Sequence, residues 1–196
     1  MSEQRPGQTD HVHGPGDKHE VAVISLGGVV TSQSVRVGGD ELDNSIIQFV
    51  KKEYSLALGE RTAEEIKVAL GSACELEEEL HAEIRGRDLV SGLPKTIVTS
   101  TDEIRRAIAE PLNAIVDSVK VTLDKTPPEL AADIMEQGIV LTGGGALLHG
   151  LDARLSAETG MPVLIAKNPL HSVVLGSGQC LEEFGALKSL LSSAPH

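Results

Sequence analysis

A glycine-rich segment, Gly138-Ile-Val-Leu-Thr-Gly-Gly-Gly-Ala-Leu-Leu-His-Gly150, is the feature that most limits how this chain can fold. Residues 139–142 are β-branched or aliphatic and are bounded by glycine, a pattern typical of a buried strand. Three glycines then allow a sharp turn, and residues 146–148 begin a helix. The unpaired N–H groups at such a helix start can contact a phosphate or a sugar. A structural tight turn without a ligand explains the triplet equally, because it matches neither the P-loop nor the dinucleotide fingerprint.

Five further blocks accompany this segment in a fixed order along the chain. They are Glu20-Val-Ala-Val-Ile-Ser-Leu-Gly-Gly28, Gly39-Asp-Glu-Leu-Asp43, Gly59-Glu-Arg-Thr-Ala-Glu-Glu-Ile-Lys67, Arg85-Gly-Arg-Asp-Leu-Val90 with Gly92-Leu-Pro-Lys95, and Lys125-Thr-Pro-Pro-Glu-Leu-Ala-Ala-Asp-Ile134. With these blocks the chain resembles the bacterial actin homologues that determine rod shape, the MreB and Mbl family. The resemblance runs from residue 20 to about residue 181.

The resemblance implies an α/β chain with the actin-like (ribonuclease H-like) ATPase fold, truncated at its N-terminus so that it represents the second half of that fold. Residues 20–58 and 100–196 would form subdomain IIA, and residues 59–99 a small α+β subdomain, IIB, inserted into it. Residues 1–19 contain only Met1 and Val12 as sizeable apolar side chains. Such a segment cannot bury enough surface to offset the entropy of ordering, so we expect a disordered tail.

The resemblance also implies a nucleotide site for ATP or ADP with Mg²⁺. The residues that match the family's adenosine contacts are Glu64, Lys67, Gly143, Gly144, Gly145 and Ala146. From the residues alone, Glu64 and Lys67 lie three apart on a short helix expected after the capping box Thr62-Ala-Glu-Glu65. That spacing by itself favours a surface ion pair between them, worth about a few tenths of a kcal/mol, and only the resemblance reverses this preference.

Other catalytic or metal sites are not indicated. No Ser/His/Asp, Cys/His or metal constellation stands at a plausible spacing, so we expect no metal site. The histidines of the tail, His11, His13 and His19, could bind a metal, although solvated histidines are the simpler explanation. Cys74 and Cys180 fit no metal-ligand spacing and are expected to be free core thiols.

The phosphate-binding parts of the family's site depart from its pattern. The first half of the fold, with its phosphate hairpin, has no counterpart in these 196 residues. Where the family has Asp-Ile-Gly-Gly-Gly-Thr-Thr before Glu20, this chain has His13-Gly-Pro-Gly-Asp-Lys-His19. Pro15 lacks an N–H, and Asp17 adds a negative charge. Losing three charge-assisted hydrogen bonds of ~1.5 kcal/mol each costs about 4.5 kcal/mol, or ~10³ in affinity. We therefore expect weak or absent nucleotide binding, no hydrolysis and no enzyme activity.

Charge and hydropathy restrict the partners. The net charge of −12 argues against nucleic acid and against direct contact with an anionic membrane. No run of about 18 apolar residues and no signal-peptide core exists, so we expect a cytoplasmic chain, recruited to the inner face of the membrane through partners. The strand from Glu20 should present an unpaired edge, next to a surface that faces the missing half. Expected partners are full-length bacterial actin filaments, other cell-shape complex proteins or a second copy of the chain.

Three hypotheses follow for the function. The first is a truncated, non-enzymatic MreB/Mbl-like cytoskeletal protein that acts in cell shape or cell-wall morphogenesis through protein contacts. The second is an ATP-binding filament former, and the third is a degenerate remnant without function.

Local signals predict where elements begin and end. Helix caps are expected at Asp40, Thr62, Ser100 and Thr126, a kink at Pro111 in a long helix, a hairpin around Gly86 with a turn at 92–94, and a last helix that starts near Gly176 and Gly178. The sheet of the main domain is expected to be mostly buried.

Overall fold

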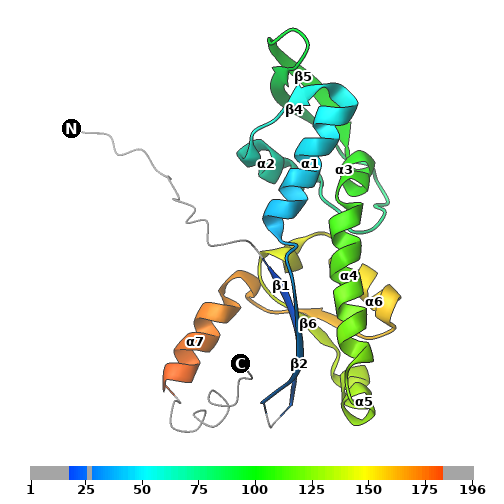
Figure 1. The fold of residues 1–196 in the computed structure, drawn as a ribbon, viewed down its shortest axis with the longest axis vertical. Coiled ribbons are helices and arrows are strands. Elements are labelled where there is room, and N and C mark those ends of the chain that lie inside the picture. Colours follow the sequence, from blue (N-terminus) through cyan, green and yellow to red (C-terminus); the bar gives the residue numbers. More distant parts are fainter. Residues whose placement is uncertain (1–17, 26–27, 183–196) are drawn as a thin grey trace, which may run out of the picture.

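The computed structural model describes residues 18–25 and 28–182, and Figure 1 shows their arrangement. The elements are β1 (His19–Ser25), β2 (Gly28–Val35), α1 (Gly39–Tyr54), β3 (Leu56–Ala57), α2 (Glu60–Leu70), β4 (His81–Asp88), β5 (Pro94–Ser100), α3 (Thr101–Ala107), α4 (Ala109–Asp124), α5 (Pro128–Gln137), β6 (Ile139–Leu141), the 3-10 helix η1 (Gly144–Leu147), α6 (Leu151–Thr159), β7 (Val163–Ile165), the 3-10 helix η2 (Pro169–His171) and α7 (Ser172–Glu182). The described chain is elongated. The helices α1, α2 and α3 lie with β4 and β5 at one end, and β1, β2, β6 and α5–α7 at the other.

The strands form three small sheets rather than one mostly buried sheet, so that prediction is wrong. Strands β1 and β2 pair as an antiparallel hairpin, β3, β4 and β5 form an antiparallel sheet, and β6 pairs with β7 in parallel. Among the residues of β1, β2, β6 and β7, only Val23 and Gly28 are buried. The hairpin packs along α4 on one side, which leaves most of its side chains in contact with solvent. An apolar strand is buried only where a second layer covers it.

The core joins the two ends of the molecule along α3 and α4. Ile104, Ile108 and Leu112 are completely buried, as is Ile46 on α1. With Ile115 and Val119 they form the inward face that the helical spacing predicts, and Leu123 at its end is half-buried. The core is aliphatic, as expected for a chain without tryptophan.

The predicted long helix is interrupted earlier than the kink expected at Pro111. Helix α3 ends at Ala107 and α4 begins at Ala109, with Ile108 between them at φ −93° and ψ 4°. Pro111 has no N–H to donate to the carbonyl four residues before it, which is that of Ala107. The missing hydrogen bond therefore accounts for a break at the end of α3.

One of the four predicted caps is confirmed. The Ser100 side chain accepts from the N–H of Glu103, and the Glu103 carboxylate accepts from the N–H of Ser100. The other three are wrong: α1 and α2 begin after Gly38 and Gly59 in extended conformation, and α5 begins after Pro127. Asp40 lies in the first turn of α1, Thr62 lies inside α2, and the Thr126 hydroxyl donates to the Thr122 carbonyl.

Two glycine predictions also change. The β4–β5 hairpin exists, but Gly86 pairs with Lys95 inside β4 rather than forming the turn. A Cβ on Gly86 would lie 2.4 Å from the Ala57 carbonyl oxygen, so glycine is needed for the close approach of β3. The last helix begins at Ser172, which places Gly176 and Gly178 inside it.

The described part of the chain has no helix that is long and apolar enough to cross a bilayer. Of the predicted tail, residues 1–17 lie outside the described residues, and His19 already belongs to β1. Cys74 and Cys180 are free, as predicted, but half-buried rather than in the core.

Candidate functional site

The glycine turn follows β6 directly, as the sequence predicts. Gly143 has φ +80°, a backbone conformation that residues with a Cβ rarely adopt. Its N–H donates to the Pro169 carbonyl at 2.9 Å, and the Thr142 hydroxyl donates to the same carbonyl at 3.1 Å. These contacts hold the turn against the start of η2. They also remove the Gly143 N–H from the donors that a ligand could use.

The helix after the glycines is shorter than predicted. Gly144–Leu147 form the four-residue 3-10 helix η1, and the α-helix α6 begins only at Leu151. The first N–H groups of a helix have no acceptor within it, so Gly144 and Gly145 supply the donors that remain. A single short turn has little dipole. Its attraction for a phosphate is therefore weaker than that of the longer helix expected from the sequence.

The glycines of the turn differ in how much free space lies next to their Cα atoms. A Cβ on Gly143 would meet no atom within 4 Å, and one on Gly144 would meet only Leu170, at 3.7 Å. A Cβ on Gly145 would lie 2.8 Å from Nε2 of His19, so the first residue of β1 packs against this glycine. Ala146 is 3% exposed and packs beneath the turn. The open side of the turn is therefore at Gly143 and Gly144.

Lys67 is held by a nearly buried ion pair that joins α2 to α1. Its Nζ lies 2.7 Å from Oδ2 of Asp43, and the two side chains are 16% and 12% exposed. The same ammonium donates to the Gly39 carbonyl at 3.2 Å. Of the three donors of a lysine, two are thus engaged within the chain. One remains for a ligand.

Glu64 is exposed on α2, one turn before Lys67. The spacing of these two residues also allowed a surface ion pair between them. The described part of the chain does not form that pair, because Lys67 pairs with Asp43 instead. Glu64 is still close enough for its charge to act on Asp43. Lys67 therefore lies in the junction of α1 and α2, and Glu64 lies near it.

The structure connects this junction to the glycine turn. The segment directly after α2 runs parallel to the segment directly after η1, and the N–H of Ala73 donates to the His149 carbonyl at 2.8 Å. A Cβ on Gly71, the residue that ends α2, would lie 3.1 Å from Cδ1 of Leu148. The segments that directly follow the two groups of predicted site residues are therefore in contact, although they are about 75 residues apart in the sequence.

Asp43 is a site residue that the sequence analysis did not single out. Asp43 is only 9% exposed, and its Oδ1 has no hydrogen-bond partner among the described residues. Burial raises its pKa, and the hydrogen bond and charge of Lys67 only partly oppose that effect. A signal was present: Asp43 stands four and seven residues before Ile47 and Val50, on the apolar face of α1. An acid on that face needs a buried partner.

Metal binding has no support in the part of the chain that is described. No group of three or more His, Cys, Asp or Glu side chains in residues 18–25 and 28–182 could hold an ion. His11 and His13, the tail histidines for which a metal was considered, lie outside those residues, as does most of the altered hairpin sequence 13–19.

Comparisons with known proteins identify the family of the chain. A family model described as MreB/Mbl protein matches residues 12–189. The cell shape-determining protein Mbl of Bacillus cereus is 46% identical over 172 residues, which are 88% of this chain and 52% of that protein. The cell shape-determining protein MreB of Escherichia coli is 52% identical over 167 residues, 85% of this chain and 48% of that protein. The chain thus spans about half the length of the curated relatives it matches.

Solved structures give the same result. MreB5 of Spiroplasma citri bound to ADP matches with a TM-score of 0.82 and 36% identity, over 90% of this chain and 53% of that one. A MamK double helical filament matches with a TM-score of 0.67 over 78% of this chain and 46% of that one, and at 21% identity it supports the fold alone. The chain therefore belongs to the MreB/Mbl family of cell shape-determining proteins, and its fold is that of an α/β actin-like half domain.

Proposed function

We propose that this chain acts in cell shape or cell-wall morphogenesis as an actin-like cytoskeletal protein that works through protein contacts and binds nucleotide weakly or not at all. The proposed partners are full-length MreB or Mbl filaments, other cell-shape complex proteins or a second copy of the chain. The proposed place of action is the cytoplasm, with recruitment to the inner face of the membrane through those partners.

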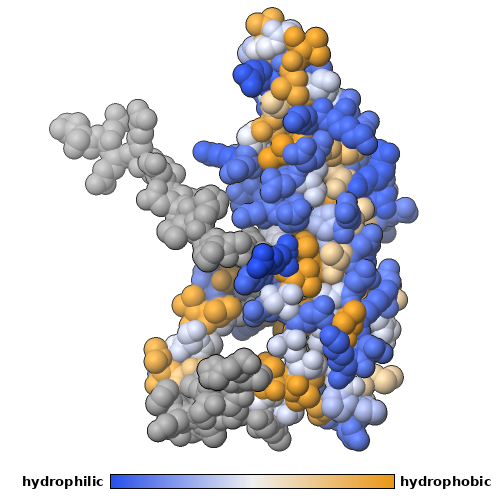
Figure 2. All heavy atoms as spheres, in the orientation of Figure 1, coloured by the Kyte–Doolittle hydropathy of each residue, from blue (hydrophilic) through white to orange (hydrophobic). Residues whose placement is uncertain are grey.

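An exposed apolar surface on η2 and α7 carries this proposal. It consists of Leu170, Val173, Val174, Leu175 and Leu181, which we call the α7 surface. Val173 and Val174 are each 71% exposed, and Figure 2 shows hydrophobic side chains over α7 at the lower left of the view. Large exposed apolar patches often mark protein contact sites, and the exposure of these five side chains supports such a role here.

The proposal of weak nucleotide binding is supported by hydrogen-bond donors of the site that already bond within the chain. The Gly143 N–H and two of the three Lys67 donors are engaged internally, and η1 is a single short turn. We propose that Glu64, Lys67, Gly143, Gly144, Gly145 and Ala146 form an adenosine contact without the phosphate contacts of a full site. Subdomain boundaries at 20–58 with 100–196, and at 59–99, are part of the same proposal.

Co-sedimentation tests the protein contacts. The chain is mixed with full-length MreB or Mbl filaments and pelleted, with and without ATP and Mg²⁺. We expect this chain to pellet with the filaments in both conditions. Val173→Glu with Val174→Glu should reduce the pelleted fraction, because charges on both exposed positions prevent apolar contact. The matched control is Val68→Glu on α2, another exposed valine, which should pellet like the parent.

A thermal shift experiment separates this proposal from the second candidate, an ATP-binding filament former. The intact glycine turn and the ADP bound by MreB5 of Spiroplasma citri favour that candidate. A site with a Kd near 1 mM gains only about 0.4 kcal/mol at 1 mM ATP, roughly 1–2 °C in Tm. A micromolar site gains about 4 kcal/mol. A rise of several degrees with ATP, together with pelleting only when ATP is present, would contradict our proposal.

A further inference from the structure

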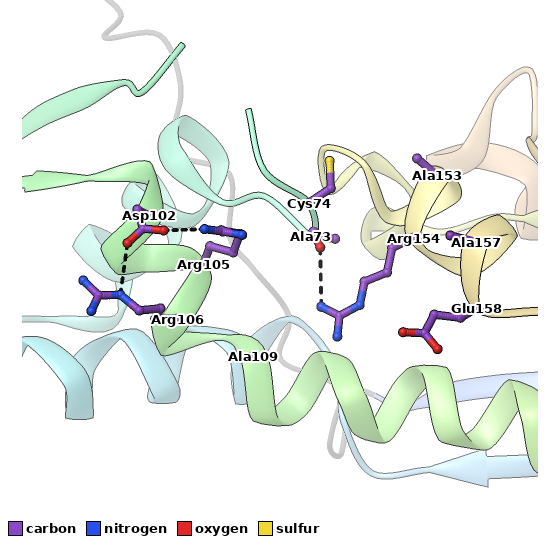
Figure 3. Close-up of a pocket in the computed structure, with 10 residues that line it drawn as sticks. All are labelled: Ala73, Cys74, Asp102, Arg105, Arg106, Ala109, Ala153, Arg154, Ala157 and Glu158. Atoms are coloured by element: carbon purple, nitrogen blue, oxygen red, sulfur yellow. Dashed lines mark hydrogen bonds and ion pairs between the residues drawn. The ribbon is translucent and has the colours of Figure 1, made fainter. Parts of the chain in front are cut away.

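A groove on another part of the molecule collects three arginines. Three parts of the chain border it: α3 together with the start of α4, helix α6, and the segment that follows α2. Its volume is about 590 Å³. Arg105 and Arg106 reach it from α3, and Arg154 from α6 (Figure 3). It is an open groove rather than an enclosed cavity. We call it the arginine groove.

Small side chains keep the groove open. Ala109 on α4 and Ala153 and Ala157 on α6 line it. None of the three carries a side chain long enough to fill the space between the helices. The groove therefore combines apolar walls with guanidinium groups, on a chain whose net charge is −12.

The three arginines differ in how far their charge is balanced. Arg105 and Arg106 both pair with Asp102, Arg106 at 3.2 Å, and Arg105 also pairs with Glu75 at 3.3 Å. Arg154 instead donates to the Asn113 side-chain oxygen at 2.5 Å and to the Ala73 carbonyl at 3.4 Å. Both of its acceptors are neutral.

The nearest carboxylate on α6 does not neutralise Arg154 by contact. Glu158 also lines the groove, but its carboxylate lies 2.5 Å from Nζ of Lys120. The hydrogen bond from Lys120 lowers the pKa of Glu158, with a smaller contribution from the charge of Arg154. A guanidinium has five N–H donors in a planar fork that matches a carboxylate. Arg154 therefore keeps donors and charge for a ligand.

We propose that the arginine groove binds an acidic peptide segment of a partner protein, with a carboxylate of that segment on Arg154. The apolar walls favour a peptide over a free anion, because the alanines can contact the aliphatic part of a Glu or Leu side chain while the arginine binds the carboxylate. Arg105 and Arg106 line the other side of the groove, where Asp102 and Glu75 already balance their charge, so Arg154 is the arginine that the proposal depends on. The proposal is independent of the α7 surface and of nucleotide binding.

Fluorescence anisotropy with the full chain tests this. The probe is a fluorescein-labelled hexapeptide of alternating Leu, Asp and Glu, and its control is the same peptide with Asn and Gln. We expect saturable binding of the acidic peptide only, weakened about tenfold by Arg154→Gln, since one charge-assisted pair is lost. Arg61→Gln is the matched control, because Arg61 is an exposed arginine paired with Glu65 on α2; it should bind like the parent.

A second variant and an internal reporter guard against a folding artefact. Ala157→Leu fills the groove while all arginines remain, and it should weaken binding with an unchanged melting temperature. Cys74 lines the groove and Cys180 lies on α7, so bound peptide should slow alkylation of Cys74 and leave Cys180 unchanged, as read by mass spectrometry. The proposal is overturned by absent saturation at 1 mM peptide, by equal losses in the Arg61 and Arg154 variants, by equal binding of the amide peptide, or by displacement with equimolar inorganic phosphate.

Discussion

Replacing Lys67 by Met should destabilise the chain far more than replacing Asp43 by Asn, although the two residues form one ion pair. Lys67→Met keeps the aliphatic stem and removes the ammonium that lies 2.7 Å from Asp43 Oδ2. The carboxylate is then unpaired on both oxygens, because Oδ1 has no partner in the described residues. A carboxylate left alone in a nearly buried site costs about 3 kcal/mol. For a chain of this size that is a loss of about 6–12 °C in Tm.

Asp43→Asn should have little effect at pH 7. Burial raises the pKa of Asp43 more than Lys67 lowers it, so the folded chain holds this proton more tightly than the unfolded chain does. The stability linked to the neutral carboxyl is therefore complete below the ordinary pKa and is lost as the pH rises through the folded pKa. An amide keeps the shape and is neutral at every pH, and its oxygen can accept from the Lys67 ammonium, which also keeps its hydrogen bond to the Gly39 carbonyl. We expect its free energy of unfolding to lie within about 1 kcal/mol of the parent.

Urea unfolding followed by far-UV circular dichroism measures these differences. The double variant Lys67→Met with Asp43→Asn should recover most of the loss, because no buried charge remains. The deficit of Lys67→Met should shrink as the pH falls, because protonation of Asp43, whose pKa burial raises, removes the unpaired charge. Arg61→Met is the control on the same helix, since its pair with Glu65 is 92% and 64% exposed and is worth less than about 0.5 kcal/mol. The reasoning is wrong if Asp43→Asn destabilises more than Lys67→Met.

Three further changes test other parts of the fold. Burial raises the pKa of Glu103, but hydrogen bonds, the largest from Tyr54, outweigh it and lower that pKa below the ordinary value of 4.5. The stability that the ionised Glu103 contributes is therefore present above pH 4.5 and is lost as the pH falls through the pKa of the folded chain. Tyr54→Phe should therefore cost about 1 kcal/mol in urea at pH 7 and reduce that acid sensitivity. Gly86→Ala should cost about 1–3 kcal/mol in urea unfolding, because its Cβ would lie 2.4 Å from a backbone oxygen of β3. Gly143→Ala should lower the unfolding free energy by about 1–2 kcal/mol through its positive φ alone, whereas Gly144→Ala should melt like the parent.

Elements with strong local signals could be predicted from the sequence. Helix α6 covers Leu151–Thr159 and ends at Gly160 in the left-handed conformation, as expected for a glycine that follows a helical segment. The capping box at Ser100 forms as expected. In both cases the residues that determine the structure lie within one helical turn of each other, so their interaction depends little on distant contacts.

Features that depend on distant contacts could not be predicted. Nothing local distinguishes Gly59, which precedes α2, from Thr62, which has the better capping side chain. The partner of Lys67 is 24 residues away, on a helix whose orientation is set by the core. The spacing of Glu64 and Lys67 therefore favoured a surface pair, whereas burial of Asp43 selects the long-range one. The burial of the strands likewise depends on which elements lie above them, and periodicity does not contain that information.

The parallel pair β6 and β7 has a consequence for how the chain would respond to a partner. Each strand has only three residues, and Val140, Leu164 and Ile165 are exposed. Parallel ladders are normally sandwiched between layers that keep water from their amides. With so short a ladder, separating the two strands costs little, whereas the tightly packed helices around Ile104 open only with the whole domain. A protein that covered these strands would therefore rigidify the very segment that carries the glycine turn.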